Sequence, residues 1–133
     1  MRPDDPDDLI PGYFRAWEVL RSTGHGLGDG DDPLDEWLFT SLYGLGPAPE
    51  DLLDVVLALI DQAPDAEARA FVVASPLSDL IVLRAEQFGD RIVERMRADA
   101  RFRSIMEGTM LMYRDTVAEP LRGRLLGLLD PGQ

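Results

Sequence analysis

Apolar residues recur at intervals of three and four along most of the chain, the spacing that gathers side chains on one face of an α-helix. Proline and capping residues separate these rows and place helix starts at Asp32-Pro33 and at Ser75-Pro76. The rows predict helices at about 11–22, from 33 to a break at 44, at 50–63, from 65, from 75, from 89, around 102–106 and at about 116–129. No stretch shows the sustained alternation and β-branched enrichment of a strand. The predicted fold is all-α with no sheet, either a compact bundle or a HEAT-like stack of about six to eight short helices.

A chain of 133 residues has the length of one domain, and we expect 1–133 to form a single acidic helical domain. The proline-rich residues 1–10 are expected to be a frayed start. Residues 23–32 contain four glycines and are expected to form a flexible loop. No internal repeat is visible, which makes a true solenoid the less favoured architecture.

The most apolar predicted helix is 50–63, whose apolar side chains surround almost the whole circumference. This pattern predicts almost complete burial of four residues, Leu53, Val56, Leu57 and Ile60. Positions 51, 54, 58, 61 and 65 advance by three or four, and the charged members of this stripe are Asp51, Asp54, Asp61 and Asp65. Two interpretations stay open: a docking ridge for a basic partner, or the solvent edge of a buried helix, which is the more common arrangement.

The net charge lies entirely in the first half of the chain. Residues 1–65 carry fifteen carboxylates and three arginines, whereas residues 66–133 carry ten of each. The formal net charge of −12 should therefore attract basic surfaces to the first half and repel nucleic acid. In the second half, Glu94 lies within helical reach of the arginines at 91 and 97, and Asp99 within reach of those at 95 and 103. Internal pairing is thus favoured over phosphate binding.

The composition removes several kinds of chemistry. Without cysteine the chain has no thiolate nucleophile, no disulfide and no cysteine-ligated zinc. The single histidine, His25, lies between two glycines, where little would orient it as a catalytic base. Four nearby aspartates could complete a metal site with it, Asp29, Asp31, Asp32 and Asp35. Pro33 stands where a further ligand is needed, so we expect a surface loop, no metal and no cofactor.

The expected location is the cytoplasm. The N-terminal residues are acidic and lack an apolar segment, so we expect no secretory signal. The longest apolar run, 55–60, is too short to cross a bilayer, and we expect no membrane partner.

The segment Ser-Pro-Leu-Ser-Asp-Leu at 75–80 resembles the Gly-Pro-Leu-Glu-Asp-Leu-Leu motif of a family of small uncharacterised bacterial proteins. That family's following Ala-x-x-Asp-x-x-Phe-Arg segment is similar to Ala-Asp-Ala-Arg-Phe-Arg at 98–103, and Trp37 with Leu38 matches a tryptophan near the family's start. The resemblance covers about 35–112 and departs at Ser78, which replaces the glutamate of a capping box. It implies an all-helical domain of unknown function and assigns no catalytic residue.

The sharpest functional hypothesis is a non-enzymatic protein-binding domain, an immunity-type inhibitor that covers a basic surface of a toxin with its acidic half. Its expected contact residues are the four aspartates of the stripe, with Trp37 as an aromatic anchor. The alternative is a homo-oligomeric structural or regulatory module, in which the acidic half of one copy pairs with arginines of another. An enzyme is the third hypothesis, because no spacing selects a pair of catalytic carboxylates.

Overall fold

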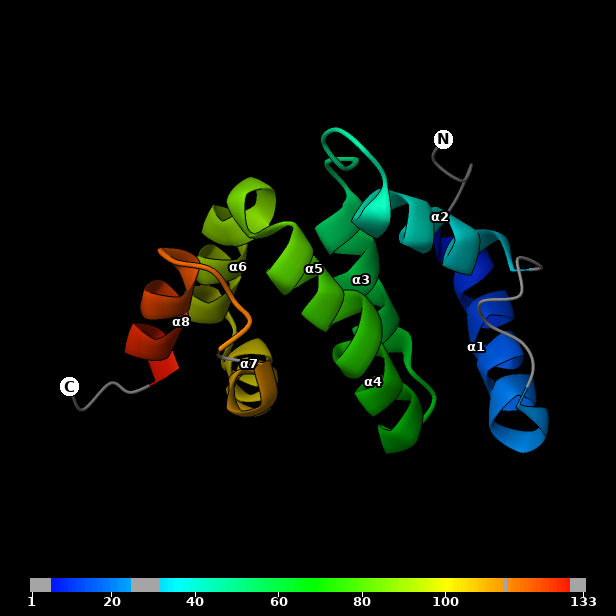
Figure 1. Ribbon diagram of the computed structural model, residues 1–133. Coiled ribbons are helices and arrows are strands. Elements are labelled where there is room, and N and C mark those ends of the chain that lie inside the picture. Colours follow the sequence, from blue (N-terminus) through cyan, green and yellow to red (C-terminus); the bar gives the residue numbers. More distant parts are fainter. Residues whose placement is uncertain (1–5, 25–31, 114, 130–133) are drawn as a thin grey trace. The chain divides into compact units, whose positions relative to one another are not determined.

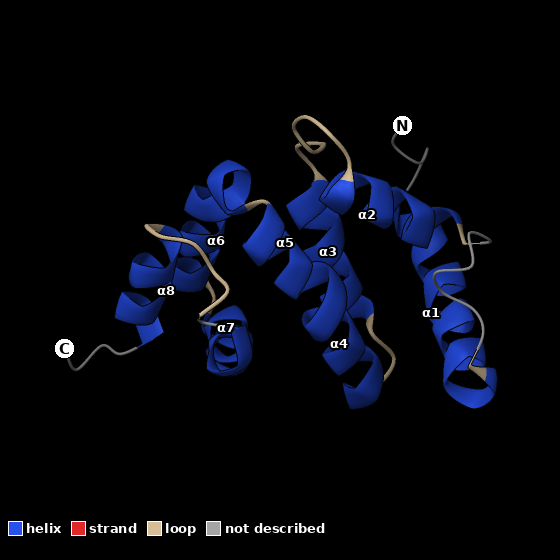
Figure 2. Ribbon diagram, viewed as in Figure 1, coloured by secondary structure: helices blue, strands red, loops and turns tan. Residues whose placement is uncertain are grey.

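The computed structural model describes residues 6–24, 32–113 and 115–129, without the side chains of residues 6 and 7. These residues form eight α-helices and one π-helical segment, η1 (Figure 1). The elements are α1 Pro6–Thr23, α2 Pro33–Tyr43, α3 Leu52–Gln62, α4 Ala66–Val72, η1 Val73–Leu77, α5 Ser78–Leu83, α6 Ala85–Ala98, α7 Ala100–Tyr113 and α8 Leu121–Leu129. No strand occurs in these ranges (Figure 2), so the prediction of an all-α fold is confirmed for them.

The chain divides into two compact units, Met1–Val72 and Val73–Gln133, called unit 1 and unit 2 below. Unit 1 contains α1 to α4, and unit 2 contains η1 and α5 to α8. By sequence, unit 1 carries sixteen carboxylates and four arginines, whereas unit 2 carries nine of each. The charge difference therefore coincides with a structural boundary. A single domain over 1–133 stays a prediction.

The core of unit 1 is built around α3, which contacts α1 and α4, while α1 also packs against α2. The apolar rows of all four helices contribute to it. Its buried members are Ile10, Tyr13, Phe14 and Trp17 of α1, Leu34, Trp37, Leu38 and Leu42 of α2, Leu52, Leu53, Val55, Val56, Leu59 and Ile60 of α3, and Ala68 and Val72 of α4. The helix α3 supplies the largest share, as its apolar circumference predicts.

Almost complete burial is confirmed for Leu53, Val56 and Ile60. The same prediction is wrong for Leu57. Leu57 is only partly buried, and it lies on the same edge of α3 as Asp54 and Asp61, which are both exposed. Because α1 and α4 pack against other sides of this helix, the edge that carries the aspartates stays open to solvent and Leu57 borders it.

Two predicted helix starts are confirmed by their caps. Asp32 Oδ2 accepts a hydrogen bond from the Asp35 N–H at 2.8 Å, and Pro33 is the first residue of α2. Asp65 Oδ1 accepts one from the Ala68 N–H at 2.8 Å at the start of α4. A side-chain cap of this kind stabilises a helix by about 1 kcal/mol.

The predicted frayed start is wrong for residues 6–10, and residues 1–5 lie outside the described ranges. The helix α1 begins at Pro6, five residues before the expected start, because proline is well suited to the first helical position. Ile10 is 1% exposed, so the early part of α1 is anchored in the core. In the expected loop at 23–32, Gly24 ends α1 with a φ of 80°, and residues 25–31 lie outside the described ranges.

Two predicted starts in unit 2 are also wrong. The helix α6 begins at Ala85, so Gly89 lies inside it and is buried. A Cβ atom at Gly89 would lie 3.4 Å from Leu121 Cδ1, which shows that the glycine permits a close approach of α8. The helix α8 begins at Leu121 and not near 116, and Pro120 directly precedes it.

The predicted cap at Ser75-Pro76 is replaced by the π-helical turn η1. Pro76 has no N–H to donate, so a regular α-helical ladder cannot run through it. The Ser78 hydroxyl donates to the Val73 carbonyl at 2.6 Å and closes the wider turn. The serine-proline signal thus marks an interruption of the helical ladder and not a helix start.

The core of unit 2 is centred on α6, which contacts α5, α7 and α8. Its buried apolar members are Leu77, Leu80, Ile81, Phe88, Ile92, Val93, Met96, Phe102, Met106, Met110, Val117, Leu121 and Leu125. Each unit therefore has an apolar core of its own.

Candidate partner-binding surface

The four predicted contact aspartates differ in their surroundings. Asp54, Asp61 and Asp65 are exposed, whereas Asp51, which directly precedes α3, is partly buried. One carboxylate oxygen of Asp65 caps α4, so this residue has a structural role as well. In the described ranges, Asp54 has no hydrogen bond and no ion pair. Asp54 and Asp61 therefore form the exposed acidic edge of α3.

Basic residues are missing from the whole segment that carries this edge. Between residues 32 and 65 the sequence has eight carboxylates and no arginine, lysine or histidine. They are Asp32, Asp35, Glu36, Glu50, Asp51, Asp54, Asp61 and Asp65. Like charges at helical spacing repel by roughly 0.2–0.5 kcal/mol per pair. Cations brought by another molecule would relieve this repulsion.

The arginine that precedes this segment is engaged within unit 1. Arg21 donates to Glu67 Oε2 and to Glu18 Oε2, both at 2.8 Å, and thereby links α1 to α4. Its guanidinium lies 4.9 Å from the centroid of the Trp17 ring. Glu67 first, and then Glu18, raise the pKa of Arg21 above its usual value. The charge of Arg21 is thus used locally.

Two of the eight carboxylates act on a buried phenol. Tyr13 of α1 is 1% exposed. Burial raises the pKa of Tyr13 well above its usual range, and the charges of Asp35 and Asp32 raise it further. The negative field of unit 1 therefore reaches into its core.

The outer side of α2 and the loop just after it carry three exposed apolar side chains, Phe39, Tyr43 and Leu45. They are called the aromatic patch below. Phe39 is 64% exposed and Tyr43 51%, and Leu45 is fully exposed. The rings of Phe39 and Tyr43 lie one helical turn apart, with centroids 4.9 Å apart and planes inclined by 37°. The inward apolar row of α2, which predicts the core residues of this helix, does not include these side chains. Two aromatic residues four apart on the opposite face were the available signal.

Trp37, the predicted anchor, lies in the core of unit 1. It is 5% exposed, and its indole Nε1 is buried without a hydrogen-bond partner in the part of the chain that the structure describes. The row that places Trp37 on one face with Leu34 and Leu38 is the row that packs inward. A partner would therefore meet Phe39 and Tyr43 on this helix and not Trp37.

Unit 2 pairs its charges internally. In the described part of unit 2, ion pairs join Arg95 to Asp99 at 3.2 Å, Arg97 to Glu94 at 4.0 Å, Arg122 to Glu119 at 3.0 Å and Arg124 to Asp90 at 2.7 Å. The predicted pairing is confirmed for Arg95 and Arg97. Arg103 instead donates to the Met96 carbonyl, at 2.9 and 3.1 Å, and satisfies the C-terminal end of α6.

Asp99 combines two roles in unit 2. Its Oδ1 accepts hydrogen bonds from the N–H groups of Phe102 and Arg101, and its Oδ2 accepts one from Arg95. The Phe102 N–H makes the largest contribution to lowering the pKa of Asp99 below its usual value, with Arg101 and Arg95 adding to it and partial burial opposing it. The carboxylate is thus held ionised at the start of α7.

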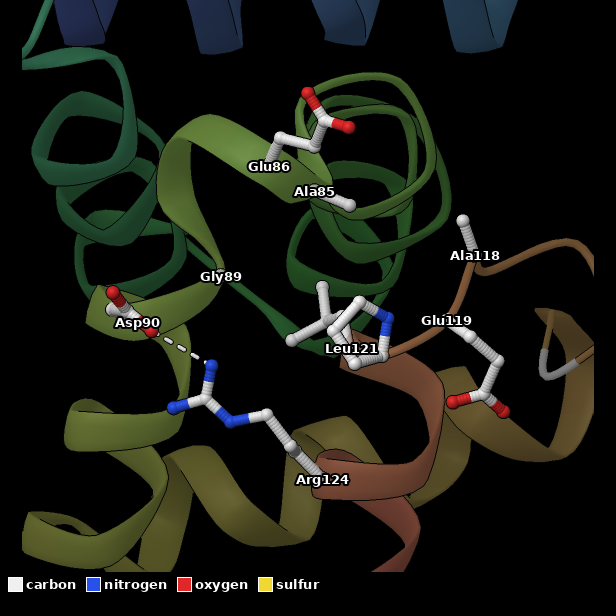
Figure 3. Close-up of a pocket in the computed structure, with 9 residues that line it drawn as sticks. Ala85, Glu86, Gly89, Asp90, Ala118, Glu119, Leu121 and Arg124 are labelled. Atoms are coloured by element: carbon white, nitrogen blue, oxygen red, sulfur yellow. Dashed lines mark hydrogen bonds and ion pairs between the residues drawn. The ribbon is translucent and has the colours of Figure 1, made fainter.

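A hollow of about 300 Å³ lies in unit 2 between the first turns of α6, the segment 118–120 and the first turns of α8 (Figure 3). Leu121 and Gly89 lie at its centre, and the ion pair of Asp90 with Arg124 closes one edge. Glu119 points away from the centre and is bound by Arg122 and by the Gly123 N–H. The hollow has room for a small apolar group, and most of its charges already have partners.

In the described ranges, no three acidic or histidine side chains form a group that could hold a metal ion. Of the metal-site candidates, His25, Asp29 and Asp31 lie outside these ranges. Asp32 serves as a helix cap, which gives its carboxylate a structural explanation.

Comparison of the chain with protein-family models, with curated proteins and with solved structures gives no match. The resemblance to the bacterial family with the Gly-Pro-Leu-Glu-Asp-Leu-Leu motif therefore stays a prediction. Among the described residues, every helix is too short or too polar to span a bilayer.

Proposed function

We propose that unit 1 binds a partner protein through a basic surface of that partner. The observation that carries the proposal is the segment 32–65, which has eight carboxylates and no basic residue. The proposed contacts are the exposed aspartates of α3, Asp54 and Asp61. Asp51, directly before this helix, and Asp65, shortly after it, extend the proposed surface at either end. A one-sign surface of this kind accelerates the encounter with an oppositely charged protein.

In its specific form, the proposal is an immunity-type inhibitor in the bacterial cytoplasm. The acidic surface of unit 1 would cover the basic surface of a toxin, such as the nucleic-acid-binding site of a nuclease, and so block its substrate. The arrangement suits this role because the whole excess of carboxylates over arginines lies in unit 1, while unit 2 has equal numbers of both.

The homo-oligomeric alternative has less support. It requires arginines of one copy to bind the acidic unit of another copy. In unit 2, Arg95, Arg97, Arg122 and Arg124 are in ion pairs, and Arg103 is bound to a carbonyl. Those internal interactions would have to break before the same arginines could serve a second copy.

The test is the association rate of the double variant Asp54→Ala/Asp61→Ala. The first partner to use is the product of the neighbouring gene if that product is basic, with surface plasmon resonance as the readout. We expect association to slow roughly threefold at low salt, and the difference to shrink as salt screens the field.

The matched control is Glu86→Ala/Glu107→Ala, which removes two exposed carboxylates from unit 2 and changes the net charge equally. We expect this control to associate at nearly the wild-type rate. Equal slowing of both double variants would mean that only the total charge matters, and the proposed surface on α3 would be rejected.

A further inference from the structure

The aromatic patch on α2 is an unusual surface for the acidic unit to expose. The tilted rings of Phe39 and Tyr43 lie 4.9 Å apart on the solvent side of the helix, while Leu34, Trp37 and Leu38 fill the core side. Large exposed apolar groups that lie together, surrounded by polar residues, commonly mark a binding surface. Aromatic residues also contribute strongly to protein interfaces when they become covered.

The charge around the patch indicates what it binds. Glu36 lies one turn before Phe39 on the same exposed side of α2. Glu36 has no hydrogen bond or ion pair in the described part of the chain. The helix contains Asp35 and Glu36 and no basic residue. A cation that rests on the Phe39 ring could therefore also reach an available carboxylate.

Unit 1 already contains one complete arrangement of this type. On α1, Arg21 lies 4.9 Å from the Trp17 ring centroid and forms an ion pair with Glu18 at 2.8 Å. On α2, Phe39 and Glu36 supply a ring and a carboxylate, but the position one turn after the ring holds Tyr43 and not arginine. The carboxylate also lies on the other side of the ring along the helix, because Glu36 precedes Phe39 by three residues whereas Glu18 directly follows Trp17. On α2 a ring and an exposed carboxylate therefore lie one turn apart, and the helix itself supplies no cation.

We propose that Phe39, Tyr43 and Glu36 form a recognition site for an arginine side chain on the basic partner of unit 1. The guanidinium would stack on the aromatic pair and donate to the Glu36 carboxylate. Arginine fits better than lysine because its planar, weakly hydrated group can stack and form paired hydrogen bonds at once. Leu45 would contact aliphatic groups of the partner next to this arginine. This inference rests on the proposed function and adds the residue type that the partner must present.

The probe is a short synthetic peptide that repeats Arg-Ala-Leu, with a matched peptide in which lysine replaces every arginine. Binding to the full chain is measured by isothermal titration calorimetry at low salt. We expect the arginine peptide to bind several times more tightly than the lysine peptide. The variant Phe39→Ala should weaken binding of the arginine peptide roughly tenfold and reduce the difference between the two peptides.

Three further variants sharpen the test. Phe39→Leu keeps an apolar side chain but removes the ring, so it should lose the preference for arginine. Glu36→Gln should weaken binding of the arginine peptide as well. Leu111→Ala removes a side chain of unit 2 that is 77% exposed and should change nothing. Phe39 is itself mostly exposed, so the melting temperature of Phe39→Ala should match the wild type.

Equal affinity of both peptides for the wild type, or unchanged binding by Phe39→Ala, would overturn this inference. If the aspartate variant Asp54→Ala/Asp61→Ala still slowed association in that case, the proposed function would stand without it. A wild-type dimer in sedimentation that Phe39→Ala converts to a monomer would also overturn it, because the patch would then belong to a contact between copies.

Discussion

The two units of this chain have similar interiors and different surfaces. In each, one helix, α3 or α6, contacts several others and provides much of the core. Unit 2 balances nine carboxylates with nine arginines, whereas unit 1 carries sixteen carboxylates against four arginines. The ion pairs of unit 2 mostly join residues three or four apart, and Arg124 with Asp90 links α8 to α6. Exposed ion pairs contribute only about 0–1 kcal/mol each, so folding does not require the pairing found in unit 2. The comparison indicates that apolar burial stabilises both units, whatever the balance of charges on their surfaces.

The largest expected effect tests whether apolar burial stabilises both units alike. Leu59 of unit 1 and Ile92 of unit 2 are both 0% exposed. Leu59→Ala and Ile92→Ala should each lower the free energy of unfolding by about 2–5 kcal/mol, because each leaves a cavity. Leu57→Ala should cost less than Leu59→Ala, since Leu57 is only partly buried. Urea denaturation followed by circular dichroism measures all three, and a loss below about 1 kcal/mol for Leu59→Ala would contradict the comparison.

A smaller effect should distinguish unit 1 at alkaline pH. The folded-state pKa of Tyr13 is raised by burial and by Asp35 and Asp32, so folding favours the neutral phenol. That stabilisation is fully present below the unfolded pKa of about 10 and is lost as the pH rises above it. Each pH unit in that window should cost about 1.4 kcal/mol of unfolding free energy.

Tyr13→Phe should remove this alkaline loss of stability, as measured by urea denaturation at a series of pH values. The control Tyr113→Phe, in unit 2, should retain the loss because Tyr13 is still present. If both variants behaved as the wild type does, another group would be responsible for the alkaline loss, and the raised pKa of Tyr13 would be rejected as its cause.

The smallest expected effect concerns glycines inside the helices of unit 2. A Cβ atom at Gly108 of α7 would meet nothing within 4 Å, so Gly108→Ala should stabilise the chain by about 0.5–1 kcal/mol. At Gly89, where the new Cβ would lie 3.4 Å from Leu121, the gain should be smaller. Thermal melts of the two variants measure the difference, and a larger gain at Gly89 would show that the contact between α6 and α8 is loose.

The sequence could predict the features that depend on neighbours along the chain. The caps at Asp32 and Asp65 and the proline that begins α2 follow from local hydrogen bonding and backbone geometry. The all-α class follows from periodicity alone. The exposure of Asp54 and Asp61 is common to both interpretations of the stripe, because a row of like charges on an apolar helix is seldom buried.

Features that depend on packing between helices could not be predicted in the same way. Leu57 is apolar, but it borders an edge of α3 that α1 and α4 leave open. Phe39 looks like a core residue by type, yet the inward row of α2 passes through Trp37. Gly89 with the following aspartate predicts the start of a helix, but the glycine lies inside α6, where Leu121 packs against it. Each of these outcomes depends on residues distant in the sequence.

The placement of the two tryptophans gives the acidic unit a spectroscopic signal of its own. Trp17 and Trp37 both lie in unit 1, both are 5% exposed, and the sequence of unit 2 has none. Intrinsic indole fluorescence therefore follows the unfolding of unit 1 alone, whereas the far-ultraviolet signal of the helices follows both units. Coincident transitions of the two signals would identify one cooperative folding domain, and separate transitions would identify two.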